Sequence, residues 1–213
     1  MTRFALLLAA GVSAVAISSA AHAADLIIDE PAAGVVDVSG NWDGPYIGVF
    51  AGYGAGTYEE AAGFEADTSG WLAGVALGAN FTVTDGIVAG IVGDIAWSNI
   101  GFEDVFGDAN IDWVGSLRGR LGFDGGAFLP YLTAGLAVAG ATVHNNISGL
   151  SDSGTHVGWT VGAGVEFAAT ENLSIDLLYR YSDYGDQTYN VGFADFDAGF
   201  KTHQITVGLN WSF

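Results

Sequence analysis

Residues 173–184 read LSIDLLYRYSDY, and large apolar side chains occupy every second position from Leu173 to Tyr181. In a β-strand these positions share one face, because successive side chains point to opposite sides of the sheet. The other face carries Asp176 and Arg180. A charge-free apolar face opposite a face with charges is typical of a strand that separates lipid from a polar barrel interior.

The same alternation recurs from Trp42 to the C-terminus. It predicts eight strands, near residues 44–56, 69–82, 87–98, 110–123, 127–143, 157–168, 173–184 and 200–213. Short links alternate with long, acidic, glycine-rich ones near residues 57–68, 99–109, 144–156 and 185–199. Tight periplasmic turns and long outer loops have this order in membrane barrels. We therefore predict an all-β, eight-stranded antiparallel up-and-down transmembrane barrel over residues 42–213.

Aromatic residues on the predicted outward face sort by height along the barrel. The extracellular end has Tyr53, Trp71, Trp97, Trp113, Trp159, Tyr179 and Tyr181. The periplasmic end has Phe81, Phe123, Phe128, Phe167, Trp211 and Phe213. Two such girdles are expected at membrane interfaces. A secreted β-sandwich or lipocalin-like barrel, the soluble alternative, has no reason to sort its aromatics in this way.

Composition and charge agree with this class. Half of the 213 residues are apolar, and the chain has 33 glycines, three prolines and no cysteine. No stretch after the N-terminus reaches the about 18 consecutive apolar residues of a membrane helix. The net charge of −19 excludes nucleic-acid binding through phosphates, which needs Lys and Arg.

Residues 1–23 resemble a secretory signal. Arg3 supplies the positive start, residues 4–17 an apolar core, and Ala21-His22-Ala23 a small-x-small cleavage site. We predict export after cleavage before Ala24, with residues 24–41 as a periplasmic lead-in to the barrel.

Charged residues also occupy the predicted inward positions. They form two approximate layers, a lower one with Arg118, Arg120, Glu166 and Asp176 and an upper one with Asp94, Asp112 and Arg180. The neighbouring Ile111 is expected to face outward. Buried charges persist only when they are paired and hydrogen-bonded. The set therefore forms either a polar plug that satisfies itself or a narrow, gated ion path.

Candidate catalytic and metal-binding residues are few. His144 and His156 flank one long link and could approach each other, and His203 could pair with Ser182 or Ser98 in a lipid-modifying hydrolase. A confident acidic orienter for such a pair is missing. No phosphate loop, dinucleotide fingerprint or zinc spacing occurs. We predict no catalytic residue, no cofactor and no metal, and a protein that is not an enzyme.

Several motifs resemble one family. WDGPYIG at 42–48, LPYLTAGLA at 129–137, GWTVGAGVE at 158–166 and YRYSDYG at 179–185 are similar to strands of the porin-family, opacity-type outer-membrane β-barrel proteins of alphaproteobacteria. The ending GLNWSF at 208–213 resembles the signal read by the barrel-assembly machinery, with Trp211 and Phe213 as its aromatic positions.

The resemblance implies a surface protein of the cell outer membrane. Its expected partners are outer-membrane lipids, lipopolysaccharide and the assembly machinery, with possible host or peptidoglycan contact. The leading hypothesis is a structural protein that supports envelope integrity and makes surface contacts through acidic loops. The alternatives are a narrow porin-like channel for ions or small solutes and a lipid-modifying enzyme.

Overall fold

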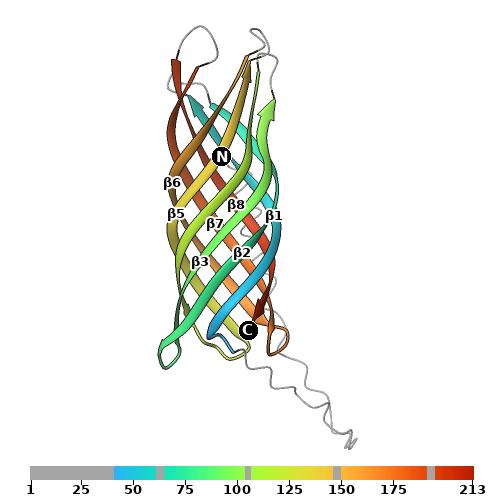
Figure 1. Cartoon of the computed structure of the whole chain (residues 1–213), viewed down its shortest axis with the longest axis vertical. Helices are drawn as coiled ribbons and strands as arrows, with labels where there is room; N and C mark the ends of the chain where they lie inside the picture. Colours follow the sequence, from blue (N-terminus) through green and yellow to red (C-terminus); the bar gives the residue numbers. More distant parts are fainter. Residues whose placement is uncertain (1–40, 61–64, 104–106, 146–149, 191–194) are drawn as a thin grey trace, which may run out of the picture. The chain divides into compact units, whose positions relative to one another are not determined.

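Eight antiparallel strands close into one barrel in the computed structural model, which describes residues 41–60, 65–103, 107–145, 150–190 and 195–213 (Figure 1). The strands are β1 (Gly44–Glu60), β2 (Glu65–Thr84), β3 (Ile87–Glu103), β4 (Gly107–Phe123), β5 (Phe128–Asn145), β6 (Leu150–Ala168), β7 (Leu173–Asn190) and β8 (Asp195–Ser212). Each pairs with its neighbour in sequence, and β1 pairs with β8 from Tyr46↔Ser212 to Glu60↔Ala198. The predicted fold class is confirmed. No helix in the described part of the chain is long and apolar enough to cross a membrane.

Three short turns and the C-terminus lie at one end of the barrel, here called the turn end (Figure 1). Gly86 and Gly126 both have a φ of +79°, a left-handed conformation that glycine adopts without strain. Asp124 stabilises the second turn by accepting a hydrogen bond of 2.8 Å from the Gly126 amide. The predicted short links are therefore confirmed to within one or two residues.

The opposite end, here called the far end, differs from the prediction. The proposed long loops are mostly strand: β1 runs to Glu60 and β2 begins at Glu65, within the expected 57–68 link. The other three expected loops are shortened in the same way. The strands contain 17 to 20 residues, whereas about 9–11 tilted residues cross a bilayer. Hydrogen-bonded strands therefore continue well past the span that a membrane requires.

The two faces of the wall separate as predicted. Large apolar side chains from every strand are exposed on the outside, from Ile47 on β1 to Leu209 on β8. The interior has three zones. An apolar cluster of Trp42, Val88 and Leu129 closes the turn end. Polar and charged residues fill the middle, and a second apolar cluster that includes Leu72, Ile100, Ile111, Tyr184 and Phe200 lies toward the far end.

The expected signal peptide, residues 1–23, and most of the lead-in, residues 24–41, lie outside the described residues. The first residue of the predicted barrel range, Trp42, is described and has a defined role. Trp42 is buried, and its indole Nε1 donates a hydrogen bond of 3.2 Å to the carbonyl oxygen of Gly126 in a turn. A residue two positions before β1 thus fills the interior at the turn end.

Candidate functional site

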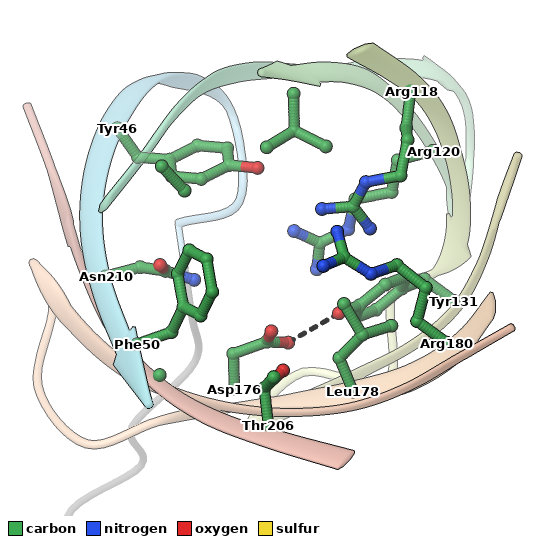
Figure 2. Close-up of a pocket in the computed structure, with 13 residues that line it drawn as sticks. Tyr46, Phe50, Arg118, Arg120, Tyr131, Asp176, Leu178, Arg180, Thr206 and Asn210 are labelled. Atoms are coloured by element: carbon green, nitrogen blue, oxygen red, sulfur yellow. Dashed lines mark hydrogen bonds between the residues drawn. The ribbon is translucent and has the colours of Figure 1, made fainter. Parts of the chain in front are cut away.

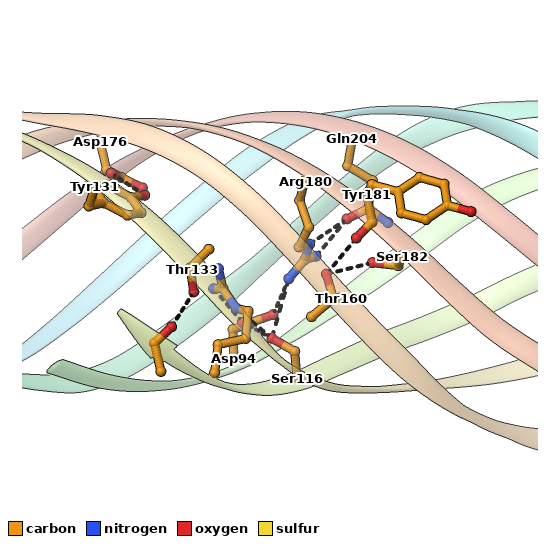
Figure 3. A network of polar contacts seen from close by, with 12 residues as sticks. Asp94, Ser116, Tyr131, Thr133, Thr160, Asp176, Arg180, Tyr181, Ser182 and Gln204 are labelled. Carbon is orange, nitrogen blue, oxygen red and sulfur yellow. Dashed lines mark hydrogen bonds and ion pairs between the residues drawn. The ribbon is translucent and has the colours of Figure 1, made fainter. Parts of the chain in front are cut away.

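One carboxylate, Asp94 on β3, joins two arginines in the upper part of the interior (Figure 3). Arg118 Nη2 lies 2.8 Å from Asp94 Oδ2, and Arg180 Nη1 lies 3.0 Å from Oδ1. The Ser116 hydroxyl donates to the same carboxylate. All three charged side chains are buried, so each ion pair forms away from bulk water.

Arg180 extends this group across the barrel. Its Nε and Nη2 donate to Gln204 Oε1 at 3.0 and 2.6 Å. Since Asp94 is on β3 and Gln204 on β8, the guanidinium connects opposite parts of the wall. Every nitrogen of this guanidinium has an acceptor, as a buried arginine requires.

A second ion pair lies closer to the turn end. Arg120 Nη2 donates to Glu166 Oε2, while Ser174 and Asn210 donate to Glu166 Oε1, the latter at 2.8 Å. The Arg120 guanidinium carbon also lies 3.8 Å from the centre of the Tyr131 ring, a cation–π contact. The pair is therefore held on both sides by additional contacts.

Asp176 completes the charge balance of the interior. Its carboxylate accepts a hydrogen bond of 2.7 Å from the Tyr131 hydroxyl. It lines a cavity of about 40 Å³ toward which the three guanidinium groups converge (Figure 2). Such a volume has room for only a few water molecules. Three arginines and three carboxylates thus share the interior, with no excess charge among them.

The predicted interior charges are largely brought together. Asp94, Arg118, Arg120, Glu166, Asp176 and Arg180 all lie inside the barrel. The two predicted layers are partly wrong, because Arg118 reaches up to Asp94 instead of joining Glu166. The side chain of an arginine is long enough to cross the difference in height that strand tilt leaves between neighbouring residues.

The prediction for Asp112 is wrong. This residue is exposed on the outside, where it accepts a hydrogen bond of 2.7 Å from the Thr142 hydroxyl. A β-bulge is the reason: Ile111 pairs with Ala141 and Trp113 with Gly140, so Asp112 is an extra residue in β4. Ile111, expected outside, is fully buried inside the barrel.

Sequence reasoning missed several neutral partners of the charges. Ser116, Ser174 and Gln204 are hydrogen-bonded to Asp94, Glu166 and Arg180. Each occupies an inward position of its strand, so the alternation that located the charges could also have located these residues.

The predicted girdle residues lie on the outer surface. Trp71, Trp97 and Trp159 are exposed toward the far end, as are Tyr53 and Tyr179. Tyr181 and Trp113 are partly covered. At the turn end the exposed aromatics are Phe81, Phe123, Phe128, Phe167, Trp211 and Phe213.

The candidate catalytic pair is separated by the wall. Ser182 is buried inside, where it donates to Thr160 at 2.9 Å, whereas His203 is exposed outside, 2.7 Å from the Tyr179 hydroxyl. Ser98 instead accepts a hydrogen bond of 3.1 Å from the Ile100 amide. His156 is buried against Phe200, and the His144 side chain lies outside the described residues. Within the described ranges, no three His, Cys, Asp or Glu residues are grouped as metal ligands.

Comparison with known proteins identifies the family. The family model described as "Outer membrane protein beta-barrel domain" matches residues 5–213 of this chain. The chain belongs to this outer-membrane β-barrel family. The resemblance found in the sequence motifs is compatible with it, and as a member of this family the protein is located in the cell outer membrane.

Two relatives of this outer-membrane barrel cover most of the chain. A "22 kDa outer membrane protein" of Rhizobium leguminosarum bv. viciae is 36% identical over 179 residues, which are 84% of this chain and 81% of the relative. A "25 kDa outer-membrane immunogenic protein" of Brucella abortus biovar 1 (strain 9-941) is 33% identical over 199 residues, 92% of each chain. The structure of Neisserial surface protein A aligns at a TM-score of 0.48 with 20% identity, covering 78% of this chain and 97% of that one.

Proposed function

We propose that this outer-membrane barrel is a structural surface protein with a plugged, non-conducting lumen. It supports envelope integrity as a stable membrane anchor and makes contacts outside the cell through the strand extensions at its far end. The observation that carries the proposal is the filling of the interior by three arginines and three carboxylates, which are connected by three ion pairs and by further hydrogen bonds.

Two properties of that set favour a plug over a channel. Three ion pairs are buried there, and a path for ions would have to separate charges that are costly to leave buried without their partners. Apolar clusters also lie on both sides of the charges, with Leu129 and Trp42 below and Leu72 and Phe200 among the residues above. An ion would have to cross these apolar zones as well as the polar one.

The surface contacts follow from the orientation that we infer. Membrane barrels have short turns on the periplasmic side, which puts the far end outside the cell. The extended strands carry acidic residues there, among them Glu59, Glu60, Glu65 and Asp67. Lipopolysaccharide is the proposed partner at the outer leaflet, host molecules are further candidates at the far end, and peptidoglycan is a candidate on the periplasmic side. Trp211 and Phe213 are proposed to engage the assembly machinery.

Conductance and stability, measured together on three proteins, test the plug. The wild type, Arg180→Ala and the control Thr133→Ala would be refolded and inserted into planar bilayers. Thr133 is a suitable control because it is buried inside but makes one hydrogen bond of 2.8 Å to the Gly119 carbonyl oxygen. We expect no discrete current from any of them, because the apolar zones remain. Arg180→Ala should unfold at a clearly lower urea concentration than Thr133→Ala.

A gate gives the opposite pattern. Discrete current steps from the wild type would favour the narrow-channel alternative over the plug. Current that appears in Arg180→Ala with little loss of stability would do the same. Unchanged lipid A in cells that overexpress the protein is expected as well, and modified lipid A would favour the enzyme alternative.

A further inference from the structure

The outer wall has a polar pocket that the plugged lumen does not use. It has a volume of about 150 Å³ and lies over β4, β5 and β6 toward the far end. Its side-chain lining includes Asp112, Trp113, Thr142, Ser153 and Thr155. A carboxylate and three hydroxyl-bearing side chains thus surround one indole on the outer wall.

The β-bulge in β4 creates this pocket. Because Ile111 and Trp113 pair with the adjacent residues Ala141 and Gly140, the extra residue Asp112 is pushed out of the ladder. Its exposed carboxylate then lies beside Thr142, whose hydroxyl donates to Oδ2 at 2.7 Å. Bulges commonly re-aim a side chain in this way.

The indole of Trp113 lies flat against the wall. A Cβ atom added at Gly140 would lie 2.1 Å from its Nε1, and one added at Gly115 would lie 3.9 Å from its Cζ3. The two ends of the indole therefore rest on glycines of β5 and β4. One face of the ring is held by the backbone, which leaves the other directed away from the barrel.

These groups have the chemistry that recognises a sugar ring. The C–H-rich face of a pyranose packs on an aromatic face, while its hydroxyls donate to a carboxylate and exchange hydrogen bonds with Ser and Thr hydroxyls. A bound anion would be repelled by Asp112. A Ca²⁺ ion takes about 6–8 oxygen ligands, including several carboxylates in its strong sites, and the described lining of the pocket offers one carboxylate.

The height of the pocket fits the same occupant. Trp113 pairs across the strands with Trp97, an outward residue of the far-end aromatic set that is 68% exposed. Aromatic girdles mark the membrane–water interface, where the headgroups of glycolipids begin. We propose that the pocket formed by Asp112, Trp113, Thr142, Ser153 and Thr155 binds a saccharide, with Trp113 as the stacking platform and Asp112 as the hydroxyl acceptor. This proposal does not depend on whether the lumen conducts.

Binding would be measured with the full chain refolded in an amine-oxide detergent, because sugar-headed detergents would compete. The free probe is the core oligosaccharide of lipopolysaccharide after complete deacylation, titrated by calorimetry. The lipid-linked probe is intact lipopolysaccharide in phosphocholine vesicles. Binding of the free probe assigns the site to the saccharide itself, and binding of the intact lipid alone assigns it to a membrane-anchored saccharide. Either result supports the proposal, provided that the variants below respond.

Three variants and one matched control separate this pocket from general adhesion to aromatics. Asp112→Asn and Trp113→Ala should each weaken binding about tenfold, the equivalent of about 1.4 kcal/mol. Gly140→Ala should also weaken it, because the new Cβ displaces the indole. The control Trp71→Ala removes an exposed tryptophan of the far-end set that lies on β2, away from the pocket on β4, β5 and β6, and its affinity should equal that of the wild type.

The heat-induced gel shift shows whether each variant folds. If Trp113→Ala or Gly140→Ala does not fold, Asp112→Asn still tests the pocket, because it preserves the shape of the side chain. The proposal is overturned if the wild type binds neither probe, if folded Asp112→Asn binds as tightly as the wild type, or if Trp71→Ala loses as much affinity as Trp113→Ala.

Discussion

Glu166 receives hydrogen bonds from Arg120, Ser174 and Asn210 inside the barrel. Replacing it with glutamine keeps its size but removes the ion-pair partner of the buried Arg120 guanidinium and turns one of the acceptor oxygens of Glu166 into an amide donor. We expect Glu166→Gln to lower the free energy of unfolding by about 3–5 kcal/mol. Urea titration of the protein in lipid vesicles measures this loss.

Ser182→Ala is the matched control for that change. It removes one buried hydrogen bond between neutral groups, Ser182 to Thr160, and should cost about 0.5–1.5 kcal/mol. Equal losses in the two variants would mean that the Arg120–Glu166 pair contributes no more than an ordinary hydrogen bond.

Interior glycines make room for the tyrosines that fill the lumen. A Cβ at Gly164 would lie 2.5 Å from Cζ and the hydroxyl oxygen of Tyr131, whereas one at Gly119, on the outer face, would meet its nearest atom at 3.9 Å. We therefore expect Gly164→Ala to cost about 1–3 kcal/mol by overpacking. Gly119→Ala should leave the urea midpoint almost unchanged, and a comparable loss at both positions would contradict this account of the interior.

Strand ends differ in how well the sequence predicts them. At the turn end the expected starts at residues 44, 87 and 173 agree with β1, β3 and β7. At the far end the strands continue several residues beyond the expected limits. Alternation of apolar and polar residues exists only where one face meets lipid. Past the membrane the outer face no longer meets lipid, so the backbone pairing continues without the regular alternation that locates the strands in the sequence.

The bulge in β4 explains a second error of the prediction, the assignment of Asp112 and Ile111 to the wrong faces of the strand. Assigning faces by alternation assumes an unbroken strand, and a single extra residue reverses the assignment of everything before it. Asp112 and Ile111 were therefore exchanged between the two faces. Inward charges beyond the bulge, such as Arg118 and Arg120, were assigned to the correct face. Their ion-pair partners depend on the tilt of the strands and on the length of the side chains, and the alternation of residues carries no information on either.

Deleting Asp112 should be tolerated for the same reason. Ile111 and Trp113 would become consecutive and still pair with Ala141 and Gly140, so both keep their present faces. Deleting Gly119, which removes no side chain, should instead turn the residues on one side of it to the wrong face. Heat-induced gel shifts should show a folded barrel for the first deletion and none for the second. A folded product from both would mean that register in β4 is not fixed by its faces.

Charge is distributed very unevenly over the whole molecule. The chain contains five basic residues, and three of them, Arg118, Arg120 and Arg180, are paired inside the barrel. The other two basic residues are Arg3, near the N-terminus, and Lys201. The chain has 24 acidic residues in all. The charges that the structure describes inside the barrel balance one another, so the net charge of −19 comes from the rest of the chain.

This distribution predicts how the protein inserts into membranes. The unfolded chain must first approach the bilayer, and anionic headgroups repel a chain of this charge. Folding into vesicles that contain phosphatidylglycerol should be slow at 0.01 M salt and faster at 1 M, because the screening length falls from about 30 Å to about 3 Å. Folding into pure phosphocholine vesicles should change far less over the same range. The gel-shift time course measures both rates, and an equal response to salt in the two lipids would show that hydrophobic transfer, rather than surface charge, limits insertion.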